Sequence, residues 1–125
     1  MISTPFVIDE QNAAVESSPE ERCQWRTLTS ADRAPSRGLT SGVAEIEPGG
    51  GLALHRHAPH EVYYILDGHG VVTLGDQEHV VGPGAAVYIP GDTPHAFRNA
   101  GTTLLRFFWV FPTDSYGDVE YVMLD

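Results

Sequence analysis

Short strand-like segments, separated by turn residues, constrain the fold more than any other feature of this sequence. From Leu39 onward they run between five and nine residues and end at glycine, proline, aspartate or asparagine. Thirteen glycines and nine prolines in 125 residues interrupt the chain too often for long helices. The segments are LTSGVAEIE (39–47), EVYYIL (61–66), GVVTLG (70–75), EHVVG (78–82), AAVYIP (85–90), HAFRN (95–99) and TLLRFFWVF (103–111). The pattern predicts an all-β fold, an antiparallel barrel or double-sheet roll, with hairpin turns at Asp67-Gly68 and near Gly75-Asp76.

The N-terminal third has a different character. Residues 1–37 are polar and irregular, with Pro5, Pro19 and Pro35, and only PFVI (5–8) and QWRTLT (24–29) resemble strands. We therefore expect one domain with an N-terminal arm over residues 1–38 and a barrel over residues 39–125.

The charge balance excludes several classes of partner. The formal net charge is −10, and residues 41–125 carry eleven acidic residues against three arginines. Such a surface repels nucleic acid and anionic membranes, so we expect neither as a partner. The chain has no lysine, which excludes Schiff-base chemistry on a lysine side chain.

Cysteine usage and the N-terminus are compatible with a cytoplasmic protein. Cys23 is the only cysteine, so no internal disulfide can form, and a reducing cytoplasm is compatible with this. The first residues have neither a basic segment nor a long apolar core, and no 18-residue apolar stretch follows. We expect a cytoplasmic protein.

A histidine-rich stretch, HRHAPHE (55–61), precedes the segment EVYYIL. Side chains alternate across a strand, so His55 and His57 point the same way if the backbone is extended. Glu61 keeps that parity, although Ala58-Pro59 introduces a turn between them. Two imidazoles and a carboxylate on one face can bind a divalent cation.

A second stretch, GPGAAVYIPGDTPHAFRN (82–99), strengthens the indication of a metal site. The two stretches together resemble the cupin superfamily over about residues 43–111. The first cupin motif, G-x5-HxH-x3,4-E-x6-G, is met by Gly49, His55, His57, Glu61 and Gly68. The second, G-x5-PxG-x2-H-x3-N, is met by Gly84, Pro90, His95 and Asn99. Asp92 stands where this motif has glycine, and we expect it to change the turn before His95 but not the ligand set.

The resemblance implies a cupin-type β-barrel, a double-stranded β-helix or jelly roll, with a metal ion in its mouth. The ligands it implies are His55, His57, Glu61 and His95. One divalent ion per chain is expected, with Fe(II) or Mn(II) preferred and Ni, Co or Zn also compatible. Four protein ligands on a six-coordinate ion leave two positions for water, oxygen or substrate.

Strand parity and the resemblance also imply roles for residues other than the metal ligands. Tyr63 shares parity with Glu61 and is expected to line a pocket. In cupin lyases that cleave dimethylsulfoniopropionate, a tyrosine in an E-x-Y segment like this one acts as a base. The same segment also occurs in cupins in which the tyrosine only forms part of the pocket wall, and this structural role is the primary expectation for Tyr63. Phe97 shares parity with His95 and is expected to line the same pocket, while Asn99 is expected to fix a turn. His60 is expected on the rim, with a role in proton transfer as the alternative.

The segment LLRFFWVF (104–111) is apolar on both faces, so its outer face needs a cover. A homodimer is expected, with the N-terminal arm as a contributor or as the alternative cover. Arg56 and Arg98 alternate with inward ligands and should point outward. This leaves Arg26, Arg37 and Arg106 as the only candidate anion clamps, so a small neutral or singly anionic substrate is expected.

Three functions are compatible with these observations. The first is a metal-dependent oxygenase acting on a small organic molecule, which is the primary prediction. The second is a metal-dependent lyase or isomerase in which Tyr63 or His60 moves a proton. The third is a binding or sensing domain without turnover, because the cupin shell hosts all three. Oxygen consumption separates the first from the others, and product formation without oxygen identifies the second.

Overall fold

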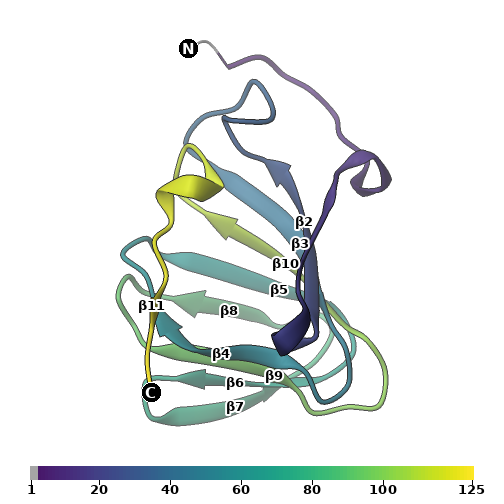
Figure 1. The fold of residues 1–125 in the computed structure, drawn as a ribbon, viewed down its shortest axis with the longest axis vertical. Helices are drawn as coiled ribbons and strands as arrows, with labels where there is room; N and C mark the ends of the chain where they lie inside the picture. The colour runs from purple at the N-terminus through teal and green to yellow at the C-terminus, as the bar shows by residue number, and fades with distance from the viewer. Residues whose placement is uncertain (1–2) are drawn as a thin grey trace.

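Two antiparallel sheets form the protein (Figure 1), and the computed structural model describes residues 3–125. In spatial order, the six-stranded sheet contains β1 (Val15–Ser18), β2 (Cys23–Thr29), β3 (Thr40–Ile46), β10 (Leu105–Phe111), β5 (Glu61–Asp67) and β8 (Ala86–Ile89). The five-stranded sheet contains β11 (Val122–Met123), β4 (Gly51–Arg56), β9 (His95–Asn99), β6 (Gly70–Leu74) and β7 (Gln77–Val81). Three 3-10 helices complete the described elements: η1 (Glu10–Asn12), η2 (Pro19–Glu21) and η3 (Tyr116–Asp118).

The inner faces of the two sheets enclose one apolar core. In β10, Leu105, Phe107, Trp109 and Phe111 are buried, whereas the residues between them are only partly covered. This period of two is the one expected for a strand packed on one face. The prediction of an all-β jelly roll is confirmed. Across residues 3–125 no ladder of hydrogen bonds joins the two sheets, so they pack as a sandwich.

The strand segments expected from residue 39 onward are all present, and one of the two expected hairpins is confirmed. β6 and β7 pair around Gly75-Asp76 with Leu74 opposite Gln77. The hairpin expected at Asp67-Gly68 is wrong, because β5 and β6 belong to different sheets. The chain instead turns a corner there: Gly68 has φ +81°, and a Cβ at this position would lie 2.5 Å from the carbonyl oxygen of Leu104.

The N-terminal segment contributes strands to the six-stranded sheet. β2 pairs with β3, placing Trp25 opposite Ala44, and β1 adds an outer strand beyond β2. The boundary expected after residue 38 therefore falls between two hydrogen-bonded strands. QWRTLT lies within β2 as expected, whereas PFVI forms no strand. β1, with the sequence VESS, was not predicted because its residues lack the apolar alternation of a strand.

The C-terminal segment returns across the open end of the sandwich to the edge of the five-stranded sheet (Figure 1). Its two-residue strand β11 pairs with β4, placing Val122 opposite Arg56 and Met123 opposite His55. Within residues 3–125, no helix has the length and apolarity needed to cross a membrane.

Asn99 ties three backbone segments together where β9 ends. Its Nδ2 donates to the carbonyl oxygens of Ile46 and Thr103, both at 2.8 Å, and its Oδ1 accepts from the Gly101 amide at 2.9 Å. The side chain is buried, so each of these bonds satisfies a group that water reaches poorly. The turn-fixing role expected for Asn99 is confirmed.

We expect Asn99→Ala to lower the free energy of unfolding by about 3 kcal/mol, because it leaves buried carbonyl groups without a donor. Urea denaturation measures this directly. Arg98→Ala is the matched control: the Arg98 side chain is exposed and forms an ion pair with Glu78 at 3.1 Å, so a change within about 0.5 kcal/mol is expected. Equal effects of the two variants would contradict the assignment.

Candidate metal centre

Three histidines from two paired strands form a buried cluster. His55 lies near the C-terminal end of β4, His57 is the first residue after that strand, and His95 is the first residue of β9. His55 is the cross-strand partner of His95, and their ring centroids lie 4.1 Å apart. The three candidate ligand atoms lie within 4.8 Å of one another, and no side chain is more than 2% exposed. The cluster could hold a metal ion.

Each imidazole is oriented by a backbone carbonyl close in sequence. Nδ1 of His55 lies 2.7 Å from the Ala53 oxygen, and Nδ1 of His95 lies 2.8 Å from the Thr93 oxygen. His57 makes the equivalent contact with the Pro59 oxygen at 3.0 Å. A carbonyl only accepts, so each Nδ1 carries the proton and donates it. In the neutral rings, Nε2 therefore keeps the lone pair that a metal requires.

Glu61, at the start of β5, closes the cluster from the opposite sheet. Its Oε1 lies 3.1 Å from Nε2 of His57 and 3.6 Å from Nε2 of His95. With Nδ1 holding the proton, lone pairs of nitrogen and oxygen face one another. Nε2 of His95 is buried and has no hydrogen-bond partner among residues 3–125. A divalent cation among these atoms would satisfy the lone pairs, so this donor set fits a metal.

The environment of the cluster affects each imidazole differently. Burial lowers the pKa of His55 from 6.5 to about 4, which keeps this ring neutral at pH 7. For His57, burial also lowers the pKa, but the hydrogen bond that the protonated ring donates from Nε2 to Glu61, together with the negative charge of Glu61, outweighs that effect and raises the pKa. The negative charge of Glu61 thus stabilises positive charge on the side of the cluster that it faces. A metal cation bound there would be stabilised in the same way.

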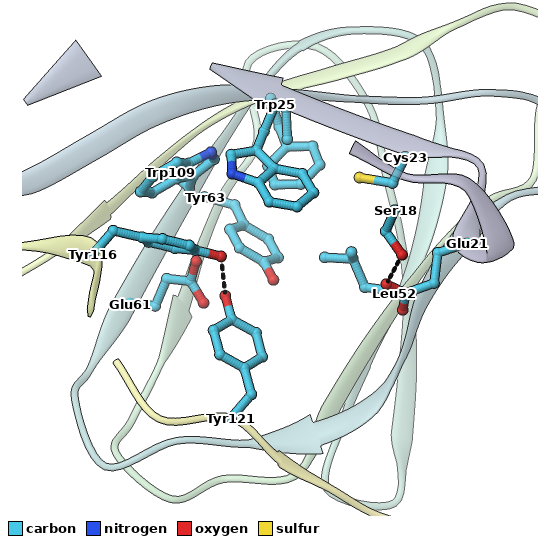
Figure 2. A pocket seen from close by; sticks show the side chains of 12 residues that line it. Ser18, Glu21, Cys23, Trp25, Leu52, Glu61, Tyr63, Trp109, Tyr116 and Tyr121 are labelled. Atoms are coloured by element: carbon cyan, nitrogen blue, oxygen red, sulfur yellow. Dashed lines mark hydrogen bonds between the residues drawn. The ribbon is translucent and has the colours of Figure 1, made fainter. Parts of the chain in front are cut away.

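A cavity of about 260 Å³ opens beside this cluster (Figure 2). Glu61 and Tyr63 of β5 line it, as does Tyr121 near the C-terminus. The remaining lining residues are Ser18, Glu21, Cys23, Trp25, Ala44, Leu52, Phe107, Trp109 and Tyr116. The wall is therefore mainly aromatic, contains two carboxylates and contains no arginine. None of the three candidate anion clamps, Arg26, Arg37 and Arg106, lines this cavity.

Tyr63 places its hydroxyl in this cavity, as Figure 2 shows. Its ring packs against Phe107 and Phe97, with centroid distances of 4.7 and 5.4 Å. Its hydroxyl makes no hydrogen bond within residues 3–125, although the side chain is only 1% exposed. Burial, and to a lesser extent the negative charge of Glu61, raises the pKa of Tyr63 well above 10.

Phe97 and His60 lie elsewhere. Phe97 is fully buried behind Tyr63 in the core and does not line the cavity. His60 is exposed on the outer side, where its Nδ1 accepts from the Gly91 amide at 2.9 Å and its ring stacks on Tyr88. His60 therefore lies outside the cavity that Tyr63 lines.

Asp92 keeps the turn before His95 compatible with the motif. Its φ is +60°, a left-handed conformation that glycine adopts freely and aspartate tolerates. Its amide donates to the His57 carbonyl at 2.7 Å. The replacement of glycine therefore leaves the histidines together.

Five aromatic residues of the cavity, Phe107 among them, lie outside both motifs and were not identified from the sequence. Trp25 comes from β2 and Trp109 from the inner face of β10. Tyr116 and Tyr121 come from the C-terminal segment, and their hydroxyls lie 3.4 Å apart. Tyr121 also stacks on His55, with ring centroids 4.8 Å apart. Strand parity indicates inward positions for Trp25 and Trp109, but no local pattern brings the C-terminal tyrosines to the site.

Comparisons with known proteins agree with this geometry. Residues 42–111 match a family model described as a cupin domain. The chain is 38% identical over 120 residues to the dimethylsulfoniopropionate lyase DddW of Ruegeria pomeroyi, covering 94% of this chain and 78% of the relative. It is 35% identical over 88 residues to the uncharacterized protein MJ1618 of Methanocaldococcus jannaschii, covering 67% of this chain and 70% of that one.

A solved structure extends the similarity to the whole fold. The polyketide cyclase RemF from Streptomyces resistomycificus superposes with a TM-score of 0.80 at 25% identity, covering 98% of this chain and 88% of that chain. The family match spans both strands that carry the histidines. The chain belongs to the cupin family.

Proposed function

We propose that this protein is a metal-dependent lyase acting on dimethylsulfoniopropionate or a closely similar β-sulfonium carboxylate. The observation that carries the proposal is the Tyr63 hydroxyl, which has no hydrogen-bond partner within residues 3–125 and lines the same cavity as Glu61. The lyase that is 38% identical along most of this chain supplies the substrate class. The mainly aromatic cavity beside the histidines is of a size suited to such a small molecule.

In the proposed reaction, Tyr63 would act as the base. Tyr63 Oη, as phenolate, takes the proton from the carbon next to the substrate carboxylate. The electrons of that C–H bond form a C=C bond, and the C–S bond breaks with its electron pair left on sulfur. An unsaturated carboxylate and a dialkyl sulfide result, and the proton remains on Tyr63 Oη until solvent removes it. The apolar wall around Tyr63 limits the access of competing water.

We infer that His55, His57, Glu61 and His95 hold one divalent ion, with Fe(II) or Mn(II) as first choices and Ni, Co or Zn compatible. A bound cation would supply positive charge that favours the phenolate of Tyr63 and attracts a substrate carboxylate. The supporting geometry is the three Nε2 atoms left unprotonated and the Glu61 oxygen that faces two of them.

The oxygenase that the ligand set first suggested stays a prediction. It shares the four ligands, so they do not separate it from a lyase. The two differ in their need for oxygen: β-elimination consumes none, and an oxygenase consumes it with each turnover. Comparison of turnover with and without oxygen therefore decides between them.

Tyr63→Phe should lower the rate of sulfide release from dimethylsulfoniopropionate by about 100-fold, because it removes the proton acceptor and keeps the ring. Gas chromatography of the sulfide under anaerobic conditions measures the rate. Tyr64→Phe is the matched control, since Tyr64 lies on the opposite face of β5 and is 46% exposed. Wild-type turnover in Tyr63→Phe would return this residue to a purely structural role.

Metal content tests the ligand set independently of turnover. The protein should carry about one divalent ion per chain, and His57→Ala and His95→Ala should each remove most of it. His60→Ala should retain the ion, because His60 lies outside the cavity. Elemental analysis by mass spectrometry gives the stoichiometry. Full occupancy in the His57→Ala and His95→Ala double variant would exclude the site.

We further propose a homodimer formed through the outer face of the six-stranded sheet. Over β10, β5 and β8 the cross-strand neighbours on this face are uncharged, with Phe108 opposite Tyr64, Val110 opposite Val62, and Val62 opposite Tyr88. Arg106 and Glu45 pair further along the same face. In a chain of net charge −10, the uncharged part of the face lets two copies meet with least repulsion. The groove beside Phe108 also includes Phe6, which supports a contribution from the N-terminal segment.

Tyr88→Glu should convert the dimer to a monomer, because it would bury a carboxylate in an apolar contact. Sedimentation velocity distinguishes the two masses. Val80→Glu is the control, since Val80 is 80% exposed on β7 in the other sheet, and this variant should remain a dimer. A wild-type protein that sediments as a monomer at high concentration would overturn the proposal.

A further inference from the structure

We propose that Glu21 recognises the cationic end of the substrate and so makes the cavity selective for zwitterions. This inference rests on the proposed function, which it deepens by assigning a specificity residue outside both cupin motifs. Glu21 is the last residue of η2, and it lines the cavity at the end opposite Glu61 (Figure 2).

The Glu21 carboxylate is held in place by two hydrogen bonds. Ser18 Oγ donates to its Oε1 at 3.0 Å, and the Ala53 amide donates to its Oε2 at 2.8 Å. Because Ala53 belongs to β4 and Ser18 to β1, the carboxylate is fixed between the two sheets. A fixed charge can attract a ligand without first losing side-chain freedom.

No basic side chain of the cavity wall neutralises this charge. Among the lining residues the only other charged group is Glu61, at the opposite end beside the histidines. The adjacent Arg22 lies outside the wall, with Nη2 3.9 Å from the Glu47 carboxylate. The field of Glu21 reaches the wall itself: burial raises the pKa of the Cys23 thiol to about 12, and the charge of Glu21 adds to that rise.

Aromatic side chains of the cavity wall suit the same ligand. Trp25 and Trp109 line the cavity, and an indole face attracts a sulfonium or quaternary ammonium group through cation–π interaction. A zwitterion would therefore lie with its carboxylate toward the histidine cluster and its cation toward Glu21. This orientation brings the carbon next to the carboxylate toward the Tyr63 hydroxyl.

Two unreactive ligands of nearly equal shape allow the contribution of the ligand's cationic group to binding to be measured by itself. 3-(Trimethylammonio)propionate and 4,4-dimethylpentanoate differ only in a cationic nitrogen or a neutral carbon. Calorimetry should show that the wild-type protein binds the cationic member at least tenfold more tightly. Glu21→Gln should bring the ratio of the two dissociation constants close to one, chiefly by weakening binding of the cation.

Glu21→Gln can keep both local contacts, because the amide oxygen accepts from Ala53 and the amide nitrogen donates to Ser18. Its melting temperature should therefore stay close to that of the wild type. Glu47→Gln is the matched control: Glu47 is an exposed glutamate next to Arg22 and outside the cavity, so this variant should keep the preference.

Salt gives a second measurement that needs no variant. The preference of the wild type for the zwitterion should shrink as ionic strength rises, because salt screens both the attraction of Glu21 for the cation and its repulsion of the anionic carbon analogue. Equal affinity of the wild type for both ligands, or an unchanged preference in folded Glu21→Gln, would overturn the role of Glu21. A preference that Glu21→Gln abolishes, in a protein that fails to cleave dimethylsulfoniopropionate, would support Glu21 and refute the lyase.

Discussion

Three hydrogen bonds from imidazole Nδ1 to backbone carbonyls set the chemistry of this protein. Each bond joins a histidine to a carbonyl two residues away, at 2.7 Å for His55, 3.0 Å for His57 and 2.8 Å for His95. They assign the proton to Nδ1 and direct every Nε2 lone pair to a common point. Because the acceptors are local, the orientation depends on strand and turn geometry, which the two packed sheets maintain.

The sequence was informative wherever a short spacing decides geometry. The alternation of a strand predicts that His55 and His57 share a face, and this is observed. The position of His95 beside them follows from pairing between β4 and β9, which the resemblance supplied and local pattern did not. The prediction of a hairpin at Asp67-Gly68 was wrong, because these turn residues carry the chain from one sheet to the other. A turn dipeptide specifies a local bend and does not specify which strand follows as a neighbour.

The cavity wall could not be predicted in the same way, because its members come from three distant parts of the chain. Trp25 lies in a segment set apart as an arm, and Tyr121 lies in a tail with little strand character. Trp25 reaches the site through the pairing of β2 with β3, and Tyr121, which directly precedes β11, through the pairing of β11 with β4. Such contacts arise from tertiary hydrogen bonding between edges, which leaves no periodic signal in the segments themselves.

Under the proposed function, this division between motifs and flanking strands separates metal binding from selectivity. The motifs place three histidines and Glu61 at one end of the cavity, and that end alone suits oxygenases, lyases and binding proteins equally. The flanking strands add the aromatic wall, with Glu21 at the far end. A ligand that spans both ends must satisfy a cation-binding centre and a fixed carboxylate at once. Opposite charges on one small molecule meet that requirement, whereas a fatty acid of the same shape leaves Glu21 partly desolvated without a counter-charge.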